Sequence, residues 1–316
     1  MMFKKKTSKP MTILNFKIPR PIFYASTAAA ALGITCLIKE WTGGQKLQPS
    51  VLAEGKVVIV TGANTGIGRE TALDLAKRKA KVYMACRDMS RCEAARIDIV
   101  LESNNKYVYC RKCDLASLES IREFVNRFKT EQSRLDILIN NGGVMRTPNL
   151  KTKDGFEMQL GVNHLGHFLL TNLLLDMLKN SAPSRIINVS SVAHKRGKIN
   201  KDDLNSDKNY DPGAAYAQSK LANILFTKEL AKKLAGMIHN VILHDNRYWI
   251  FWPFIKSPKQ GAYTVVYTAL SSSLNNITGK YFKDCEETEV SEAAKDEITA
   301  TWLWAVSEKW TRLQAA

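Results

Sequence analysis

The stretch Lys56–Glu70 (KVVIVTGANTGIGRE) constrains the fold more than any other part of the chain, because it predicts a strand, a glycine-rich turn and a helix in immediate succession. Its apolar run Val57–Val60 is typical of a parallel strand that is covered on both faces. The composition of Glu70–Lys79 predicts the helix that follows. Between strand and helix stand three glycines in a Thr-Gly-x-x-x-Gly-x-Gly spacing: Gly62, Gly66 and Gly68.

A turn of this kind is suited to binding the phosphates of a nucleotide. Backbone without Cβ atoms lets N–H groups approach a pyrophosphate, and the start of a helix carries partial positive charge. A glycine turn that only packs a helix closely against a strand has the same composition. The motif therefore stands as a hypothesis that the rest of the chain must support.

The remainder of the chain continues the alternation of strand and helix. Further strands are predicted at Lys81–Cys86, Tyr107–Cys113, Leu135–Ile139, Arg185–Val189, His239–Leu243 and Gly279–Phe282. Further helices are predicted at Ser90–Ser103, from Ser117, around Gly161–Phe168, from Ala214, and at Gln260–Ser271 and Ser291–Trp310. We expect the last of these to cover the edge of the sheet. This alternation predicts an α/β fold with a Rossmann-type, doubly wound parallel sheet, and we assign residues 51–316 to a single domain of that fold.

Charged residues follow two of the predicted strands. In a dinucleotide-binding fold, a carboxylate at the end of the second strand binds a free ribose 2′-hydroxyl, whereas an arginine suits a 2′-phosphate. Arg87 stands there and favours NADP, while Asp88 beside it keeps NAD open. Asp114 follows the third strand, where it can accept a hydrogen bond from adenine or cap the helix that begins near Ser117.

Polar residues also collect at the later strand ends. Asn140-Asn141-Gly142-Gly143 follows the fourth strand, where small residues let backbone lie against a ligand and asparagines can bridge neighbouring strands. Asn163 lies among apolar neighbours in a helix, as a bend or as a site residue. Ser190 and Ser191 end the fifth strand, at the edge where open α/β sheets bind ligands. Tyr216 and Lys220, four apart, share one face of a helix.

The N-terminal fifty residues differ in composition from the rest. Residues 1–39 contain basic residues and no acid, and Ile22–Ile38 is apolar or small throughout. Seventeen residues at ~1.5 Å per residue extend ~25 Å, slightly less than a ~30 Å bilayer core. A membrane anchor, a cleaved secretory signal and a mitochondrial presequence all fit this pattern. We favour the anchor, with residues 1–50 as basic N-terminus, anchor (22–38) and linker, because no convincing cleavage site follows Leu37.

Composition excludes some classes of function. The net charge is +16, but the lysines are mixed with acids and form no basic stripe with aromatics, which argues against nucleic acid as a partner. Six cysteines in a chain of this length form no disulfide framework, and we expect Cys86, Cys110 and Cys113 to be reduced, buried side chains. Neither the Cys110-x-x-Cys113 spacing nor the pair His164 and His167 has the further ligands that a metal site needs.

Taken in order, these motifs resemble those of the short-chain dehydrogenase/reductase superfamily. The matching residues are Thr61-Gly62-x-x-x-Gly66-x-Gly68, Asp114, Asn140-Asn141-x-Gly143, Asn163, Ser191 and Tyr216-x-x-x-Lys220. The segments GANTGIG, ACRD, LGVNHLGHFLL, NVSSVAH, SKLAN and GKYFKDC are similar to those of the membrane-anchored retinol dehydrogenases. That resemblance implies an NADP(H)-dependent oxidoreductase that interconverts a lipidic alcohol and an aldehyde or ketone, with retinol and retinal as first candidates. It also implies a membrane location, the endoplasmic reticulum first and a mitochondrial membrane as the alternative, and it leaves oligomerisation open.

The chemistry of the predicted site can be stated residue by residue. A tyrosine has an ordinary pKa of about 10, and a lysine ammonium one helical turn away favours its ionised form. We therefore expect Tyr216 to be the general acid or base and Lys220 to lower its pKa and hold the nicotinamide ribose. Ser191 would bind the reacting oxygen, and Asn163 would hold a water in the proton path. The expected cofactor-binding residues are Gly62, Asn64, Thr65, Gly66, Ile67, Gly68, Arg87, Asp114, Leu115, Asn141, Gly143, Tyr216 and Lys220.

Two departures from the family pattern bear on activity. Gly142 stands where the family usually has alanine, which is a mild change. His244-Asp245-Asn246 stands where His-Pro-Gly is expected, and residues 237–254 are too short for the usual flap over the nicotinamide. Loss of that cover weakens electrostatic stabilisation of the transition state. An NADP-binding protein with weak or no turnover is therefore the alternative function, and a membrane adaptor without cofactor is a third.

Overall fold

The computed structural model describes residues 19–41, 47–235, 240–244 and 257–313. Its strands are β1 (Val57–Thr61), β2 (Lys81–Cys86), β3 (Val108–Lys112), β4 (Ile137–Asn140), β5 (Arg185–Val189), β6 (Asn240–His244), β7 (Tyr281–Lys283) and β8 (Glu286–Glu287). Its α-helices are α1 (Arg20–Trp41), α2 (Gly66–Lys77), α3 (Met89–Ser103), α4 (Leu118–Glu131), α5 (Met158–Leu160), α6 (Gly166–Asn180), α7 (Pro212–Lys233), α8 (Pro258–Leu270) and α9 (Glu297–Thr311). Short η segments occur at Gly161–Leu165 (η1), Val192–Arg196 (η2), Ser272–Leu274 (η3) and Glu292–Ala294 (η4).

The strands form one sheet in the order β3-β2-β1-β4-β5-β6-β7-β8. Strand β1 lies at its centre, where Val58 is opposite Val82 of β2 on one side and Ile137 of β4 on the other. All pairs from β3 to β7 are parallel, and the short β8 is antiparallel to β7. The predicted Rossmann-type parallel sheet is confirmed. Because the chain leaves β1 and β4 in opposite directions, a crevice for a ligand is expected at their carboxyl ends.

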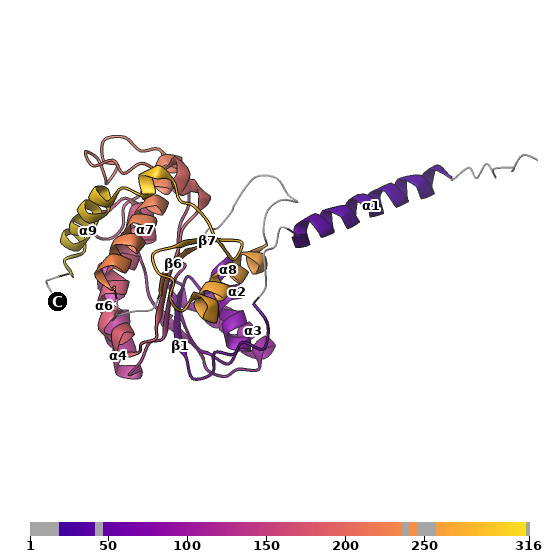
Figure 1. The fold of residues 1–316 in the computed structure, drawn as a ribbon, viewed down its shortest axis with the longest axis horizontal. Helices are drawn as coiled ribbons and strands as arrows, with labels where there is room; N and C mark the ends of the chain where they lie inside the picture. The colour runs from indigo at the N-terminus through magenta and orange to yellow at the C-terminus, as the bar shows by residue number, and fades with distance from the viewer. Residues whose placement is uncertain (1–18, 42–46, 236–239, 245–256, 314–316) are drawn as a thin grey trace, which may run out of the picture.

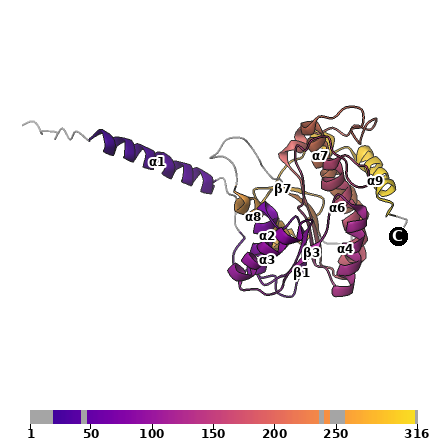
Figure 2. The same ribbon diagram turned by 180° about the vertical axis from the view of Figure 1, so that it is seen from behind.

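Helices cover both faces of the sheet (Figure 1 and, from behind, Figure 2). Side chains of β1 alternate between the two faces: Val58 and Val60 belong to the core beneath α2, α3 and α8, and Val57 and Ile59 to the core beneath α4, α6 and α7. Burial of a side chain such as Ile59, which is fully inaccessible, contributes about 1.5–3 kcal/mol. These two cores hold the strand ends in fixed relative positions.

Helix starts are set by side-chain caps that the sequence supplies. The side chains of Asp88, Ser117 and Asp211 accept hydrogen bonds from backbone N–H groups in the first turns of α3, α4 and α7. Ser257 and Gln260 form a reciprocal capping box at the start of α8. Each cap pairs a backbone donor that the helix itself leaves unsatisfied.

The structure differs from the prediction at three elements. Helix α2 begins at Gly66 rather than Glu70, so the last two glycines of the motif belong to its first turn. The helix predicted around Gly161–Phe168 contains a π turn, η1. Helix α9 was expected to cover the edge of the sheet, which was wrong: it packs outside α6 and α7, where Trp304 contacts Phe168 and Phe226. Trp304 is buried in this third layer, and Trp302 and Trp310 are partly buried.

The cysteines require a second correction. Cys92 of α3 and Cys110 of β3 form a disulfide, with Cα atoms 6.0 Å apart, although a reduced Cys110 was expected. The two residues meet because α3 packs on the face of the sheet to which Cys110 points. Cys113 belongs to the core on the opposite face, so the Cys-x-x-Cys spacing does not form one site. Burial raises the pKa of the Cys113 thiol.

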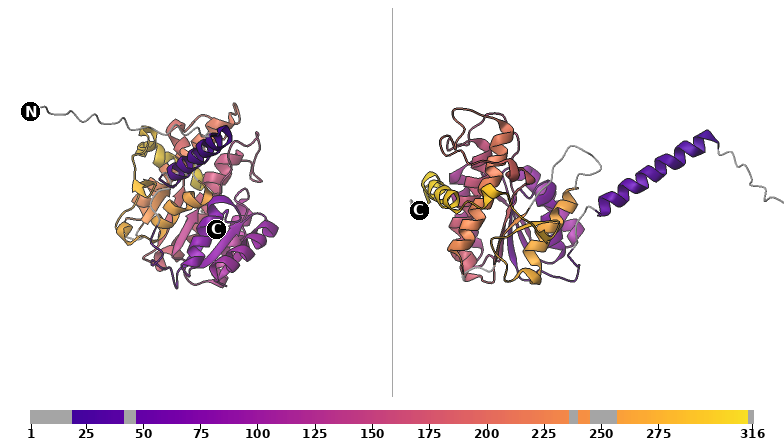
Figure 3. Two further views of the ribbon diagram at one scale, coloured as in Figure 1. Left: turned by 90° about the vertical axis from the view of Figure 1, so that its right-hand side faces the viewer. Right: turned by 45° about the horizontal axis from the view of Figure 1, so that its top comes forward.

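Residues 22–38 lie in helix α1, which extends away from the domain (Figure 3) and exposes apolar side chains such as Phe23 and Leu37. Within the ranges that the structure describes, no helix has the length and apolarity needed to cross a membrane. The anchor role of this segment stays a prediction. Of the shortened region 237–254, only β6 is described; Asp245 and Asn246 lie outside the described residues.

Candidate active site

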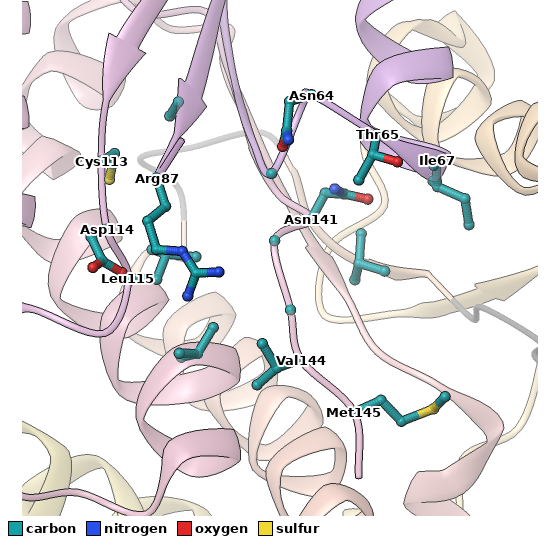
Figure 4. A pocket seen from close by; sticks show the side chains of 18 of the residues that line it. Asn64, Thr65, Ile67, Arg87, Cys113, Asp114, Leu115, Asn141, Val144 and Met145 are labelled. Atoms are coloured by element: carbon teal, nitrogen blue, oxygen red, sulfur yellow. The ribbon is translucent and has the colours of Figure 1, made fainter. Parts of the chain in front are cut away.

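A cavity of about 500 Å³ opens at the carboxyl ends of β1 to β5 and reaches helix α7. In Figure 4, Asn64 and Thr65 of the turn after β1 and Ile67 of α2 lie on one side, and Arg87, Asp114 and Leu115 lie on the other. Asn141 lies between these groups, and Val144 and Met145 extend beyond it. The cavity therefore lies over the point at which the order of the strands reverses, where α/β sheets bind ligands.

The glycine turn brings backbone close to backbone. Gly62 has φ +63°, and a Cβ atom on it would lie 2.8 Å from the Cα atom of Gly142. A Cβ atom on Gly68 would overlap the carbonyl oxygen of Gly62 and lie 2.5 Å from Nδ2 of Asn141. Only glycine avoids these overlaps. The start of α2 can therefore face the cavity with its N–H groups, as an anionic ligand requires.

Asparagines join the ends of the central strands, as the sequence predicted. Nδ2 of Asn140 donates to Oδ1 of Asn188 on β5 (2.7 Å), and Nδ2 of Asn141 donates to the carbonyl oxygen of Thr61 on β1 (2.9 Å). The hydroxyl of Thr61 accepts from the N–H groups of Asn141 and Gly142. These bonds fix the segment after β4 against the glycine turn.

Two arginines line the cavity: Arg87, directly after β2, and Arg91, in the first turn of α3. Asp88 is committed to other partners: its Oδ1 accepts from the backbone N–H of Arg91 at 3.0 Å, and its Oδ2 lies 3.6 Å from Nε of that arginine. The carboxylate that left NAD open is therefore a helix cap paired with an arginine. No binding role was predicted for Arg91. A signal was present, because a capping aspartate at position 88 places residue 91 in the first turn of the helix that follows β2.

Asp114 lines the cavity. Of its two predicted roles, capping of helix α4 belongs to another residue. Ser117 is the N-cap of α4, since its side chain accepts from the N–H of Ser120. Oδ1 of Asp114 accepts from the N–H of Ala116 at 3.0 Å. The turn holds this carboxylate at the wall of the cavity, with an oxygen lone pair available for a further donor.

Tyr216 and Lys220 of α7 form the opposite end of the cavity. The Nζ atom of Lys220 lies 5.7 Å from the centre of the Tyr216 ring and donates to the carbonyl oxygen of Val189 at 3.2 Å. Burial lowers the pKa of Lys220 to about 8. The side chain is 5% exposed, so its ammonium group acts on nearby groups with little screening by water.

Asn163 lies behind the wall of the cavity rather than in it. Nδ2 donates to the carbonyl oxygen of Val144 and to Oγ of Ser219, both at 2.9 Å, and Oδ1 accepts from the N–H of Val144 at 2.8 Å. The side chain thus joins the segment after β4 to α7. Because both amide protons have protein partners, a water held by Asn163 would have to bind an oxygen lone pair.

The two serines after β5 have different surroundings. Ser190 lines the cavity, and its hydroxyl donates to the carbonyl oxygen of Lys220 at 2.8 Å. Ser191, the predicted catalytic serine, is 4% exposed and caps η2 by accepting from the N–H of Ala193.

All thirteen predicted cofactor-binding residues line the cavity, whereas Asn163 and Ser191 are placed beside it. Asp88, Gly142 and Ser190, which stand at the strand ends noted from the sequence, also line it. The lining residues for which no motif predicted a role are Ala85, Arg91, Cys113, Val144, Met145, Val162 and Val189.

Most of these additional residues are apolar or lie next to a motif residue. Val144 and Met145 continue the segment after β4, and Met145 is 49% exposed. No spacing rule marks such positions, because an apolar residue at a cavity wall has the same composition as one in the core. Chemically, the cavity combines a backbone anion site, two guanidinium groups and a phenol beside an ammonium group.

Comparison with known proteins relates this geometry to a family. The short chain dehydrogenase family model matches residues 56–243. Retinol dehydrogenase 13 of Homo sapiens is 47% identical over 313 residues, covering 92% of this chain and 95% of that protein. Retinol dehydrogenase 12 of Homo sapiens is 49% identical over 286 residues, covering 85% and 90%. A crystal structure of an uncharacterized protein from Mycobacterium paratuberculosis has a TM-score of 0.74 at 36% identity, covering 85% of this chain and 98% of that one.

Proposed function

Because the chain belongs to the short-chain dehydrogenase family and is an oxidoreductase of the retinol dehydrogenase type, we propose that it uses NADP(H) to interconvert a lipidic alcohol and its aldehyde. Retinol and retinal are the first candidates, since the relatives are retinol dehydrogenases. The observation that carries the proposal is a single cavity that joins the glycine turn to Tyr216 and Lys220. One end suits phosphates and the other suits proton transfer.

The binding half of the proposal rests on the turn after β1 and on the arginines after β2. The first turn of α2 would bind the pyrophosphate, because Gly62 and Gly68 leave its N–H groups accessible. Arg87 and Arg91 would hold a 2′-phosphate by charge-assisted hydrogen bonds. Asp88 caps α3 and lies near the Arg91 guanidinium, so two arginines and a partly neutralised carboxylate face the ribose position, which supports NADP(H) over NAD(H).

The reaction half assigns proton transfer to α7. When bound, the cofactor supplies or accepts the hydride. Tyr216 would give a proton to the carbonyl oxygen of an aldehyde, or take one from an alcohol, and the Lys220 ammonium would favour the ionised phenol. Ser191 would orient the reacting oxygen by a hydrogen bond. Asn163 would keep the wall of the cavity in place through Val144 and Ser219.

The test is NADPH consumption by purified full-length protein against retinal and a series of saturated long-chain aldehydes. We expect turnover that rises with chain length and is much slower with NADH. Extracts of the reaction mixture should contain the alcohols that correspond to retinal and to each aldehyde. Absence of consumption with both cofactors and all substrates would contradict the proposed activity.

A second candidate follows from the region after β6. The sequence after His244 continues with Asp245-Asn246 instead of Pro-Gly, so this chain would bind NADP(H) with weak or no turnover. Grafting the Pro-Gly loop of a relative would then raise product formation without changing the affinity for NADPH. Equal, rapid turnover by the native chain and the graft would exclude this candidate.

The location proposed is a membrane surface, that of the endoplasmic reticulum first and a mitochondrial membrane as the alternative. Exposed apolar side chains of α1 support it, with Ile22, Leu32 and Leu37 each more than half exposed. Such a surface would also hold a lipidic substrate near the cavity. Flotation with liposomes of the full chain and of a variant lacking residues 1–46 would test this proposal; equal flotation of the two would contradict it.

A further inference from the structure

A buried imidazole joins the cofactor end of β1 to the turn that carries Asn163. His167 of α6 is 2% exposed, and each of its ring nitrogens has a partner. Nε2 lies 2.9 Å from Oγ1 of Thr61, the last residue of β1. Nδ1 lies 3.0 Å from the carbonyl oxygen of Asn163 in the π turn η1. The family pattern used in the sequence analysis gives this histidine no role.

The surroundings of Thr61 determine which ring nitrogen carries the proton. Its hydroxyl has one proton and two lone pairs. The N–H groups of Asn141 and Gly142 occupy the lone pairs at 2.9 and 2.8 Å. The hydroxyl proton is then donated to Nε2 of His167 at 2.9 Å, since the alternative acceptor, the carbonyl oxygen of Ile139, lies at 3.4 Å. Nε2 is therefore the acceptor, and Nδ1–H donates to Asn163.

Full burial keeps this tautomer neutral. Desolvation, with a smaller contribution from repulsion by the nearby Lys220 ammonium, lowers the pKa of His167 to about 4. At neutral pH the ring therefore holds one proton, on Nδ1. The resulting chain of hydrogen bonds runs from the backbone after β4 through Thr61 and His167 to Asn163.

We propose that His167 is a positioning residue that fixes the π turn and Asn163 against the nicotinamide end of the cavity. This inference rests on the proposed function. Gly143 lies at the point of contact, since a Cβ atom on it would be 3.1 Å from Oδ1 of Asn163 and 3.6 Å from Nζ of Lys220. A π turn is rare and is maintained only where its surroundings require it. His167 supplies that requirement by joining the turn, through Nδ1, to the end of β1, through Nε2.

Two ligands separate the two ends of the cavity. NADPH spans the whole site, whereas adenosine 2′,5′-bisphosphate reaches only the adenosine end. We expect His167→Phe, which removes both hydrogen bonds at similar volume, to weaken NADPH binding about tenfold, the effect of roughly one to two buried hydrogen bonds. Binding of the bisphosphate should stay within twofold. His167→Asn, which can still donate to Asn163 from a position near that of Nδ1, should lose less, roughly threefold.

His164 provides a matched control on the same turn. It is equally buried, but its Nε2 bonds Ser307 of α9 and its ring packs against Phe226, away from the cavity. His164→Phe should lower the melting temperature and leave the ratio of the two affinities unchanged. Isothermal titration calorimetry with both ligands measures the ratio for each variant. His167→Asn carries the test if His167→Phe does not fold.

The outcomes distinguish this inference from the function on which it rests. Wild-type protein that binds neither ligand would overturn both. Wild-type protein that binds both, together with an unchanged affinity ratio in the His167 variants, would overturn the positioning role alone. The same change in His164→Phe as in His167→Phe would also overturn it, because loss of buried structure would then be the cause.

Discussion

The phosphate end and the tyrosine end of the cavity are built in different ways. At the phosphate end, residues that are close in sequence act through the shape of their backbone, and Gly62 and Gly68 are needed because a Cβ atom would overlap a neighbour. At the tyrosine end, buried polar side chains from η1, β5, α6 and α7 act through hydrogen bonds, with Asn163, His167 and Lys220 each at most 5% exposed. The phosphate end depends on glycines that have no Cβ atom, and the tyrosine end depends on buried polar atoms that have hydrogen-bond partners.

This difference predicts how each end fails. A change at the phosphate end should weaken binding of the cofactor and leave the chemistry of bound substrate intact. A change at the tyrosine end should affect the chemical step, or unfold the helices that carry it, because an unpaired buried polar group costs about 1–3 kcal/mol. Four experiments test this division.

The largest effect is expected for Tyr216→Phe. Removing a general acid or base costs typically ~10²–10⁴ in kcat, and we expect a loss of that size while the affinity for NADPH stays within about threefold. Stopped-flow measurement of NADPH oxidation with retinal, together with calorimetric titration of the cofactor, provides both values. Retention of more than a tenth of wild-type kcat would show that the phenol is not the proton donor.

The next largest effect is expected on the stability of the fold at acidic pH. Burial lowers the pKa of His164 to about 3 and that of His167 to about 4. Below about pH 6.5, the pKa of an unfolded histidine, these two imidazoles bind protons in the unfolded chain but not in the folded one. The stabilisation by the two neutral rings is therefore complete above about pH 6.5 and is lost as the pH falls toward 4. The free energy of unfolding then falls by up to about 1.4 kcal/mol per pH unit for each ring.

Urea unfolding between pH 7 and 5 measures this slope. His164→Asn removes one titrating ring and should reduce the mean slope over this range by about 1 kcal/mol per pH unit, because the unfolded imidazole is only partly protonated near pH 7. A slope that is the same in wild type and variant would mean that other groups control the loss of stability in acid.

A smaller effect is expected at the phosphate end. Gly68→Ala places a Cβ atom against Gly62 and Asn141, which should cost about 1–3 kcal/mol, mostly as lost affinity for NADPH. Gly66→Ala is the control: nothing lies within 4 Å of its Cβ position, and only its φ of +59° is unfavourable, by about 1 kcal/mol. Calorimetric titration of both variants tests the ranking, and the reverse order of affinities would contradict the steric account.

The smallest effect is expected from Arg87→Ala. Because Arg87 is exposed, loss of its charge-assisted hydrogen bond to a 2′-phosphate should weaken NADPH binding by roughly tenfold at most, about 1.4 kcal/mol. NADH binding should not change. Arg91→Ala should have less effect, because that guanidinium is shared with Asp88. If NADPH and NADH lose affinity equally, the arginine does not bind the 2′-phosphate.

Local sequence predicted the parallel sheet and the members of the cavity wall well. Glycine spacing, apolar strands and polar strand ends act over a few residues, so Gly62, Arg87 and Tyr216 were found without a structure. Helix α2 starts four residues earlier than predicted, because glycine has low helix propensity but is tolerated in a first turn that packs closely against Gly62 and Asn141.

Contacts between distant segments escaped the sequence. The disulfide between Cys92 and Cys110 depends on which face of β3 meets α3. The packing of α9 on α7 and α6 depends on the space that their aromatic side chains leave. Neither is encoded in a spacing, because the same residues would satisfy several arrangements of the chain.

The sequence by itself determined the order of strands and helices, the glycine turn and the identity of the phenol and ammonium groups, since each follows from local backbone geometry or from a four-residue helical spacing. Only the tertiary structure decided that Asn163 joins the cavity wall to Ser219 of α7 and that His167 joins Thr61 to the π turn. Hydrogen bonds are directional and short, so a partner 56 or 106 residues away becomes evident only after the sheet and its helices have brought the two atoms within about 3 Å.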